Sequence, residues 1–304
     1  MFCHCSLNYI NPEFPIAMSQ YCQYDKTSST YDLARRPLDL NDLLSRIEAL
    51  AAARGCAVSD LKLLDVGAGS GNYYQTLRER GCMIQYHGLE GSQGMIDQFR
   101  AKTMAKDEQS RGAFSLQLCD LKKLPLALAD GVYDVVMMTQ VLHHLSDGND
   151  GHKPVYDLMA ELGRVTSSGG FLWCQTQTPQ QHGQDGFWWS AITPKASAKL
   201  AARFPPLDKY FQSLEGARYA NVESHVPSDP LMRKDIYLNI EGAFTEAWRN
   251  NDSNFSMCTA QELEEGLAKL RGIIDAGEAD KFMAEREAAR AKTGQTTTVI
   301  ATKV

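Results

Sequence analysis

A glycine-rich turn directly after an apolar strand is the feature that most limits the fold of this chain. Residues 63–71 read LLDVGAGSG, so three glycines stand at alternate positions behind Asp65. Glycine lets the backbone turn sharply and approach a ligand without a Cβ atom in the way. The dinucleotide pattern G-x-G-x-x-G needs a third glycine where this chain has Asn72, and the Gly-Lys-Ser/Thr ending of a phosphate-binding loop is absent. The stretch therefore indicates a nucleotide-type ligand with a positive amino group and no phosphates, because the carboxylate of Asp65 would repel phosphates.

Three further apolar segments read as strands, and each is followed by acidic residues or by a distinctive polar and apolar run. These segments are 84–89 followed by Glu90, 114–119 followed by Asp120 and Leu121, and 133–138 followed by TQVLHHL. Helical patterns alternate with them over 72–80, 93–104 and 154–165, after a first amphipathic helix at 38–54. This alternation predicts a parallel sheet with the ligand at the carboxyl ends of its strands.

These elements, in this order, resemble the class I S-adenosylmethionine-dependent methyltransferases. The VLHHL run at 141–145 is typical of the small-molecule branch that includes the ubiquinone and menaquinone methyltransferases. The resemblance implies an α/β fold: a Rossmann-like seven-stranded mixed sheet of order 3-2-1-4-5-7-6, with strand 7 antiparallel and with helical lid and cap insertions. It covers residues 20–176 well and residues 221–304 loosely.

The resemblance also implies a binding site for S-adenosylmethionine. Asp65 and the glycine loop would hold the methionine end, Glu90 would accept hydrogen bonds from the ribose hydroxyls, and Asp120 would bind the adenine. Alternatively, Asp65 and Glu90 bind no ligand, and each only caps a helix or lies in a solvated turn. The expected cofactor-binding residues are Tyr24, Tyr31, Asp65, Gly67, Ala68, Gly69, Glu90, Gly91, Ser92, Met95, Asp120, Leu121 and Gln140.

His143 and His144 are the candidate catalytic residues, because the fourth strand would deliver them toward the transferred methyl group. A neutral imidazole with a pKa of about 6.5 can accept a proton from a hydroxyl or an amine. In the alternative reading, one histidine shapes the methionine pocket and the other packs under the following loop. Alignment of two reactants supplies on the order of 7 to 11 kcal/mol, so a site without a general base is also plausible.

The chain is longer after its fifth strand, 171–176, than a minimal fold of this family needs. We expect a disordered leader at 1–20, an N-terminal lid and helix at 21–60, and a methyltransferase domain at 61–304. Within that domain, a helix-like segment at 186–204, a helix at 207–215 and later helical patterns at 260–269 and 279–293 indicate added structure. We assign them to cap segments at about 180–215 and 228–293.

The cap is the expected location of the acceptor pocket. Trp188, Trp189, Trp248 and Arg249 are the candidate substrate-binding residues. Aromatic walls suit an apolar, planar or cationic acceptor, and an arginine suits a carboxylate. Alternatively, the three tryptophans form the core of the cap.

Composition narrows the class of substrate. The eight cysteines include no C-x-x-C pair, so neither a zinc site nor a disulfide framework is predicted. Cys3, His4 and Cys5 could bind a soft metal ion, but three candidate ligands near a chain terminus more often bind none, so no metal site is expected. The net charge of −6, without a cluster of lysines and arginines, disfavours nucleic acid as a substrate. No apolar run is long enough to span a membrane. We expect a cytoplasmic monomer or homodimer that acts on a small molecule.

Two other classes of function stay open. A nicotinamide-dependent oxidoreductase is disfavoured by Asn72 and Asp65, and a catalytically inactive protein that binds the cofactor and regulates is the second alternative. Methylation of proteins is a further alternative. The sequence does not indicate whether the acceptor atom is oxygen, nitrogen, sulfur or carbon.

Overall fold

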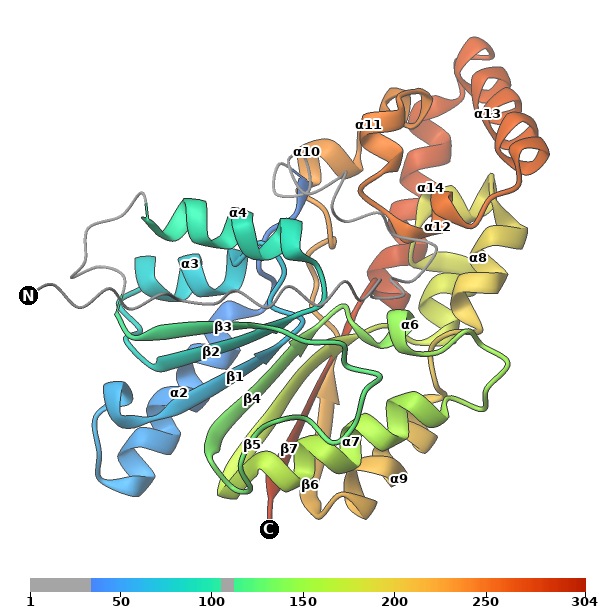
Figure 1. Cartoon of the computed structure of the whole chain (residues 1–304). Helices are drawn as coiled ribbons and strands as arrows, with labels where there is room; N and C mark the ends of the chain where they lie inside the picture. Colours follow the sequence, from blue (N-terminus) through green and yellow to red (C-terminus); the bar gives the residue numbers. More distant parts are fainter. Residues whose placement is uncertain (1–33, 105–111) are drawn as a thin grey trace, which may run out of the picture.

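Seven strands form one mixed sheet with the order β3-β2-β1-β4-β5-β7-β6, which confirms the predicted Rossmann-like fold (Figure 1). The structure, a computed structural model, describes residues 34–104 and 112–304. Strands β1 to β5 run parallel, whereas β7 lies antiparallel between β5 and β6. The strands are β1 (Lys62–Val66), β2 (Gln85–Glu90), β3 (Phe114–Leu118), β4 (Tyr133–Thr139), β5 (Thr166–Thr176), β6 (Tyr219–His225) and β7 (Thr297–Lys303).

The two faces of the sheet carry separate apolar cores. In β4, Val135 and Met137 belong to one core, Val136 and Met138 belong to the other, and all four are fully buried. Successive side chains of a strand point to opposite faces, so a strand that is covered on both faces reads as a continuous apolar run. Helices α2, α3 and α4 contribute to the first core, and α7 and α9 contribute to the second. Both faces of the sheet are therefore covered by helices.

The helices that cover the sheet begin and end within two residues of the predicted ones. They are α2 (Leu40–Arg54), α3 (Asn72–Glu79), α4 (Gln93–Met104), α7 (Lys153–Val165) and α9 (Leu207–Gly216). A short 3-10 helix, η1 (Val58–Asp60), precedes β1, and a single turn, α6 (Leu142–Leu145), follows β4. Among the described residues, every helix is too short or too polar to cross a bilayer.

A cap of helices lies beyond the carboxyl ends of the parallel strands (Figure 1). A third apolar core, which includes Trp188, Tyr237 and Leu270, holds the cap together. The cap elements are η2 (Gln181–Asp185), η3 (Trp188–Ala191), α8 (Pro194–Ala201), α10 (Lys234–Tyr237), η4 (Ile240–Phe244), α11 (Glu246–Arg249), α12 (Ser253–Ser256), α13 (Ala260–Asp275) and α14 (Ala279–Thr293).

Two parts of the expected cap differ from the prediction. The helix-like segment at 186–204 is not continuous: it divides into η3 and α8, because Pro194 lacks an N–H and begins a new helix. Helix α9, at the end of the expected segment 180–215, packs against α7 and β6 beside the sheet.

Candidate functional site

A pocket opens where β1, β4 and β5 end. Its lining combines the glycine loop with the beginning of α3, the ends of the neighbouring strands and a segment that precedes α2. The lining residues are Arg35, Arg36, Pro37, Asp65, Gly67, Ala68, Gly69, Ser70, Asn72, Tyr73, Thr139, Gln140, Gln175 and Leu231. The pocket encloses about 80 Å³, which is enough for one end of a nucleoside-sized ligand and too little for all of it.

The glycine loop has a backbone conformation that side chains rarely adopt. Gly67 has a φ of +84°, and a Cβ atom there would lie 2.4 Å from Cγ2 of Val141. Gly71 has the same φ and faces the ring of Phe99, 2.5 Å from the place of a Cβ. At Gly69, with a φ of +55°, a Cβ would meet only open space. The first and third glycines therefore serve close packing, whereas the second keeps the pocket open.

Asp65 is a buried carboxylate at the base of this pocket, with 2% of its surface exposed. Its Oδ2 accepts a hydrogen bond from the hydroxyl of Tyr86, and its Oδ1 has no partner among the described residues. Burial raises the pKa of Asp65 to about 7, the Tyr86 hydrogen bond opposes this shift, and the nearby charge of Glu90 adds to it. A buried acceptor without a partner is costly, so the site is prepared for a positively charged donor.

Glu90 ties the glycine loop to the turn after β2. Its Oε2 accepts a hydrogen bond from the N–H of Gly69, and its Oε1 accepts one from the N–H of Ser92, both at 2.8 Å. A carboxylate has about four lone-pair sites, so these bonds leave capacity for further donors. Ser92 is buried, its hydroxyl accepts a bond from the N–H of Met95, and Met95 lies in the interior. Glu90 and Gly91 therefore begin a fixed turn beside the pocket, although neither belongs to its lining.

Asp120 and Leu121 follow β3 on the same edge of the sheet. The carboxylate of Asp120 accepts a bond from the N–H of Lys122 at 3.1 Å and lies 3.8 Å from the ammonium of Lys123. Leu121 is half-buried against the core that α7 and α9 cover. Neither residue lines the pocket at the glycine loop, so their role in adenine binding stays a prediction.

Gln140 lies in the pocket in a strained conformation. Its φ is +56°, a region that costs a residue with a Cβ roughly 1 to 2 kcal/mol. Its N–H donates to the carbonyl of Gln175 at 2.9 Å, and its side-chain Nε2 is buried without a partner among the described residues. Gln140 thus presents a second unsatisfied polar group to the pocket that contains Asp65. Such strain is typical of functional sites.

His143 and His144 lie on α6, and their ring centroids are 3.9 Å apart. Burial, helped by the charges of neighbouring histidines and arginines, lowers the pKa of His143 well below its usual value. Burial and the charge of Arg203 lower the pKa of His144 to about 4. Ser253 lies 3.3 Å from Nε2 of His143, and Nδ1 of His143 has no partner among the described residues. Both rings are therefore neutral at pH 7, and both are weak bases.

The tryptophans lie in the core of the cap, which is the alternative that the sequence left open. Trp188 and Trp189 are at most 1% exposed and Trp248 is 6% exposed. The indole N–H of Trp188 donates to the carbonyl of Tyr237 at 2.8 Å, and that of Trp248 donates to the carbonyl of Ile236 at 3.0 Å. None of the three lines the pocket at the glycine loop.

Arg249 also makes a contact within the cap. Its Nη1 donates to the carbonyl of Ala243 at 2.8 Å, which holds α11 against η4. Arg249 does not line the pocket at the glycine loop.

The segment before α2 supplies residues that sequence reasoning missed. Arg35 and Arg36 line the pocket, and a β-bridge from Arg35 to Met232 fixes this segment to the cap. Arg35 also pairs with Asp252. No local pattern marks these arginines, since only the fold brings them to the glycine loop. Of the expected lid, Tyr24 and Tyr31 lie outside the described residues, as does the leader at 1–20.

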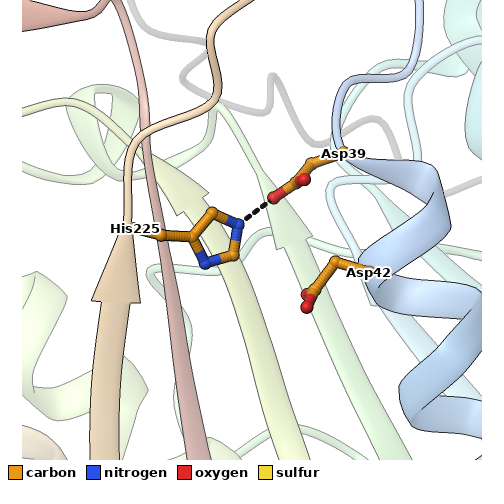
Figure 2. A group of neighbouring side chains, drawn as sticks. All are labelled: Asp39, Asp42 and His225. Carbon is orange, nitrogen blue, oxygen red and sulfur yellow. Dashed lines mark hydrogen bonds and ion pairs between the residues drawn. The ribbon is translucent and has the colours of Figure 1, made fainter.

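Asp39, Asp42 and His225 gather at the start of α2, where Figure 2 shows His225 turned toward Asp39. Their spacing would allow a metal ion, but each carboxylate already has protein donors. Asp39 accepts hydrogen bonds from His225 and Thr298, and Asp42 accepts bonds from Arg46 and from the indole of Trp173. Through these contacts the cluster attaches the start of α2 to the sheet.

Known proteins similar to this chain include methyltransferases. A family model described as "Methyltransferase domain" matches residues 64–174. Methyltransferase-like protein 27 of Homo sapiens is 32% identical over 51% of this chain and 56% of its own length. Demethylmenaquinone methyltransferase of Deinococcus radiodurans is 29% identical over 43% of this chain and 53% of its own length. The chain thus spans little more than half the length of these curated relatives.

A solved structure from Anabaena variabilis, described as a methyltransferase from an antibiotic biosynthesis pathway, superposes with a TM-score of 0.62 at 20% identity. The match covers 89% of this chain and 99% of that one. At this identity, the similarity supports the fold alone.

Proposed function

Because the chain belongs to the class I S-adenosylmethionine-dependent methyltransferase family, we propose that it transfers the methyl group of S-adenosylmethionine to a small-molecule acceptor. The relatives match only part of their own length, so the activity rests on the site as well as on family membership. The alternatives are a nicotinamide-dependent oxidoreductase and a protein that binds the cofactor without transferring a methyl group.

One observation carries the proposal: the buried oxygen Oδ1 of Asp65 has no partner within residues 34–104 and 112–304, and Asp65 lines the pocket at the glycine loop. An ammonium group would satisfy this oxygen and neutralise the carboxylate. A pyrophosphate would bring negative charge beside Asp65 and Glu90, which is unfavourable. The carboxylates of Asp65 and Glu90 therefore fit the amino-acid end of S-adenosylmethionine better than the phosphates of a dinucleotide.

Residues around Asp65 would bind the other parts of the cofactor. Arg35 supplies a positive charge in the same pocket, suited to the carboxylate of the methionine end. The amide of Gln140 offers a further donor, and Glu90 accepts from the ribose hydroxyls. Asp120 and Leu121, beyond the pocket at the next strand end, would hold the adenine. The bound cofactor supplies a methyl group on a positively charged sulfur.

Alignment and exclusion of water carry most of the proposed catalysis. His143 and His144 are neutral at pH 7, and their lowered pKa values make them poor proton acceptors. A general base contributes most when its pKa lies near the working pH. We therefore assign both histidines to positioning of the acceptor. At saturating cofactor, His144→Ala should lower turnover by less than about tenfold, within what loss of positioning alone can cost.

The function is tested by binding and by turnover. Isothermal titration should show binding of S-adenosylhomocysteine and none of NAD, and Asp65→Asn should weaken the binding at least tenfold. Incubation with S-adenosylmethionine and a metabolite extract should then form S-adenosylhomocysteine. Binding of NAD alone would establish the oxidoreductase alternative. Binding of S-adenosylhomocysteine with no turnover in any extract would establish the regulatory one.

A further inference from the structure

A second pocket lies at the other end of α6. Thr139 and Gln140, just before α6, line the first pocket, and residues just after α6 line the second. The end of α8 and helix α12 complete the wall of the second pocket. The lining residues are Asp147, Gly148, Asn149, Lys199, Ala202, Arg203, Ser256 and Met257. The pocket has a volume of about 360 Å³, within the range of about 300 to 1,000 Å³ that is usual for small-molecule sites.

The charges in this second pocket favour an anion. Lys199 and Arg203 contribute two cations, and Asp147 contributes one carboxylate, whose Oδ1 accepts a bond from the N–H of Asn149 at 2.7 Å. Lys199 forms no ion pair within the described part of the chain. Arg203 is only 5% exposed, so its charge acts in a partly desolvated wall. Charge-assisted bonds from such groups are stronger than those between neutral groups.

Arg203 also joins this pocket to the candidate catalytic turn. Its Nη1 donates to the main-chain carbonyl of His143 at 3.1 Å, and its charge adds to the burial that lowers the pKa of His144. Ala202 and Met257 supply apolar surface beside the cations. Six residues separate Gln140 from Asp147, and four of them form the single turn α6, so the two pockets lie at the two ends of this turn.

We infer that the second pocket holds an anionic group of the methyl acceptor, a carboxylate or a phosphate, bound by Lys199 and Arg203. The inference rests on the proposed methyl transfer, because it assigns the acceptor class for that reaction. The anionic group is recognised and not methylated, so the product keeps its negative charge.

Binding of simple anions to the full chain tests the pocket itself. Inorganic phosphate and acetate, titrated and followed by NMR, should each bind in a saturable manner, and the tighter of the two identifies the group. Lys199→Gln should weaken this binding at least tenfold, and so should Arg203→Lys, which keeps a charge but loses the planar fork. Lys195→Gln, on the same helix but outside the pocket lining, is the matched control and should bind as the unmodified protein does. Absence of saturable binding, or equal binding by Lys199→Gln, would overturn the inference.

The product of turnover tests the assignment to the acceptor. With methyl-labelled S-adenosylmethionine and a metabolite extract, the labelled product should be retained on an anion-exchange column at neutral pH. A labelled product that passes through the column would overturn the inference while leaving methyl transfer intact. Titration of S-adenosylhomocysteine in the same preparations separates the two proposals, because its failure to bind would contradict the proposed function, and the acceptor assignment with it, while the binding of anions in the second pocket would stand.

Discussion

The hydroxyl of Tyr86 on β2 donates a hydrogen bond to the carboxylate of Asp65 on β1, beneath the glycine loop. Both side chains are buried, and in the parallel pairing of the two strands Asp65 lies opposite Gly88, two positions beyond Tyr86. The bond satisfies one carboxylate oxygen and leaves the other for a ligand. Because the pKa of Asp65 is raised to about 7, its charge depends on pH near neutrality.

Cofactor binding should therefore depend on the protonation of Asp65. A positive amino group binds the ionised carboxylate, so affinity for S-adenosylhomocysteine should rise with pH up to about 7 and then level off. Below the pKa of the carboxyl, each pH unit should cost about tenfold in affinity. Isothermal titration between pH 5.5 and 8.5 measures this profile. Asp65→Asn should bind weakly, with a flat profile over that range.

Tyr86→Phe provides the control for this prediction. Loss of the hydrogen bond removes an interaction that lowers the pKa of Asp65, so the midpoint of the profile should move to higher pH. A profile that is unchanged in Tyr86→Phe and in Asp65→Asn would show that Asp65 does not contact the ligand.

Gly67 and Gly69 should respond differently to the same substitution. Gly67→Ala places a Cβ 2.4 Å from Cγ2 of Val141 at a residue with a φ of +84°, so the buried valine or the loop must shift, and we expect a loss of at least about 2 kcal/mol in the free energy of unfolding. The Cβ of Gly69→Ala meets open space, so this variant should lose only the free energy that a positive φ costs a residue with a Cβ, about 1 to 2 kcal/mol. Its methyl group would instead occupy the pocket and weaken cofactor binding more than its stability loss explains. Urea denaturation and titration of S-adenosylhomocysteine, made on both variants, separate these effects.

Arg35 and Arg36 form a second matched pair. Both line the pocket and both pair with an aspartate. Arg36 pairs with the exposed Asp229 at 3.1 Å, whereas Arg35 pairs with the buried Asp252 at 3.7 Å and its side chain is only 12% exposed. Arg35→Gln should weaken binding of S-adenosylmethionine by at least tenfold, because a buried charged hydrogen bond contributes about 1.5 to 3 kcal/mol. Arg36→Gln should change it less than threefold. Equal losses in the two variants would contradict a specific role for Arg35.

The elements of the fold were predictable because their signals are local. The apolar run of β1 and the period of α4 lie within single windows of sequence, and the glycine loop marks the junction between β1 and α3. The strand order followed from the resemblance to the family. The resemblance also predicts Asp65 and Gln140 at the methionine end of the site, and both residues line the pocket at the glycine loop.

Contacts between distant segments were not predictable in this way. Arg35 reaches the pocket only through its bridge to Met232, and Asp39 meets His225 across 186 positions of the chain. The role of Trp188 also depended on the fold, since a pocket wall and a cap core both bury aromatic rings. Its indole bond to the carbonyl of Tyr237 distinguishes the two.

The cluster of Asp39, Asp42 and His225 should stabilise the protein without a metal ion. Asp42→Ala leaves the indole N–H of the buried Trp173 without its acceptor, which should cost about 1 to 3 kcal/mol in the free energy of unfolding. Asp275→Ala, at the exposed end of α13, is the control and should change it by less than about 0.5 kcal/mol. EDTA should leave the melting temperature unchanged. A fall in that temperature with EDTA, restored by a divalent cation, would show instead that the cluster binds metal.

His182 should make the stability of the protein sensitive to acid. Its ring stacks on Phe187 and Phe204, and burial lowers its pKa to about 3. In the unfolded chain the same ring titrates near pH 6.5, so between these values the unfolded state binds one more proton. The free energy of unfolding should therefore fall as the pH falls below about 6.5. His182 alone contributes a loss of about 2 kcal/mol by pH 5.

His182→Phe tests this origin, because phenylalanine keeps the ring stack and the Nδ1 that it removes has no hydrogen-bond partner among the described residues. Urea denaturation at pH 7 should give the variant a stability within about 1 kcal/mol of the unmodified protein. At pH 5 the variant should be the more stable of the two by about 2 kcal/mol, with the same dependence on urea concentration. Curves of stability against pH that run parallel for the two proteins would show that His182 is not held neutral in the folded state.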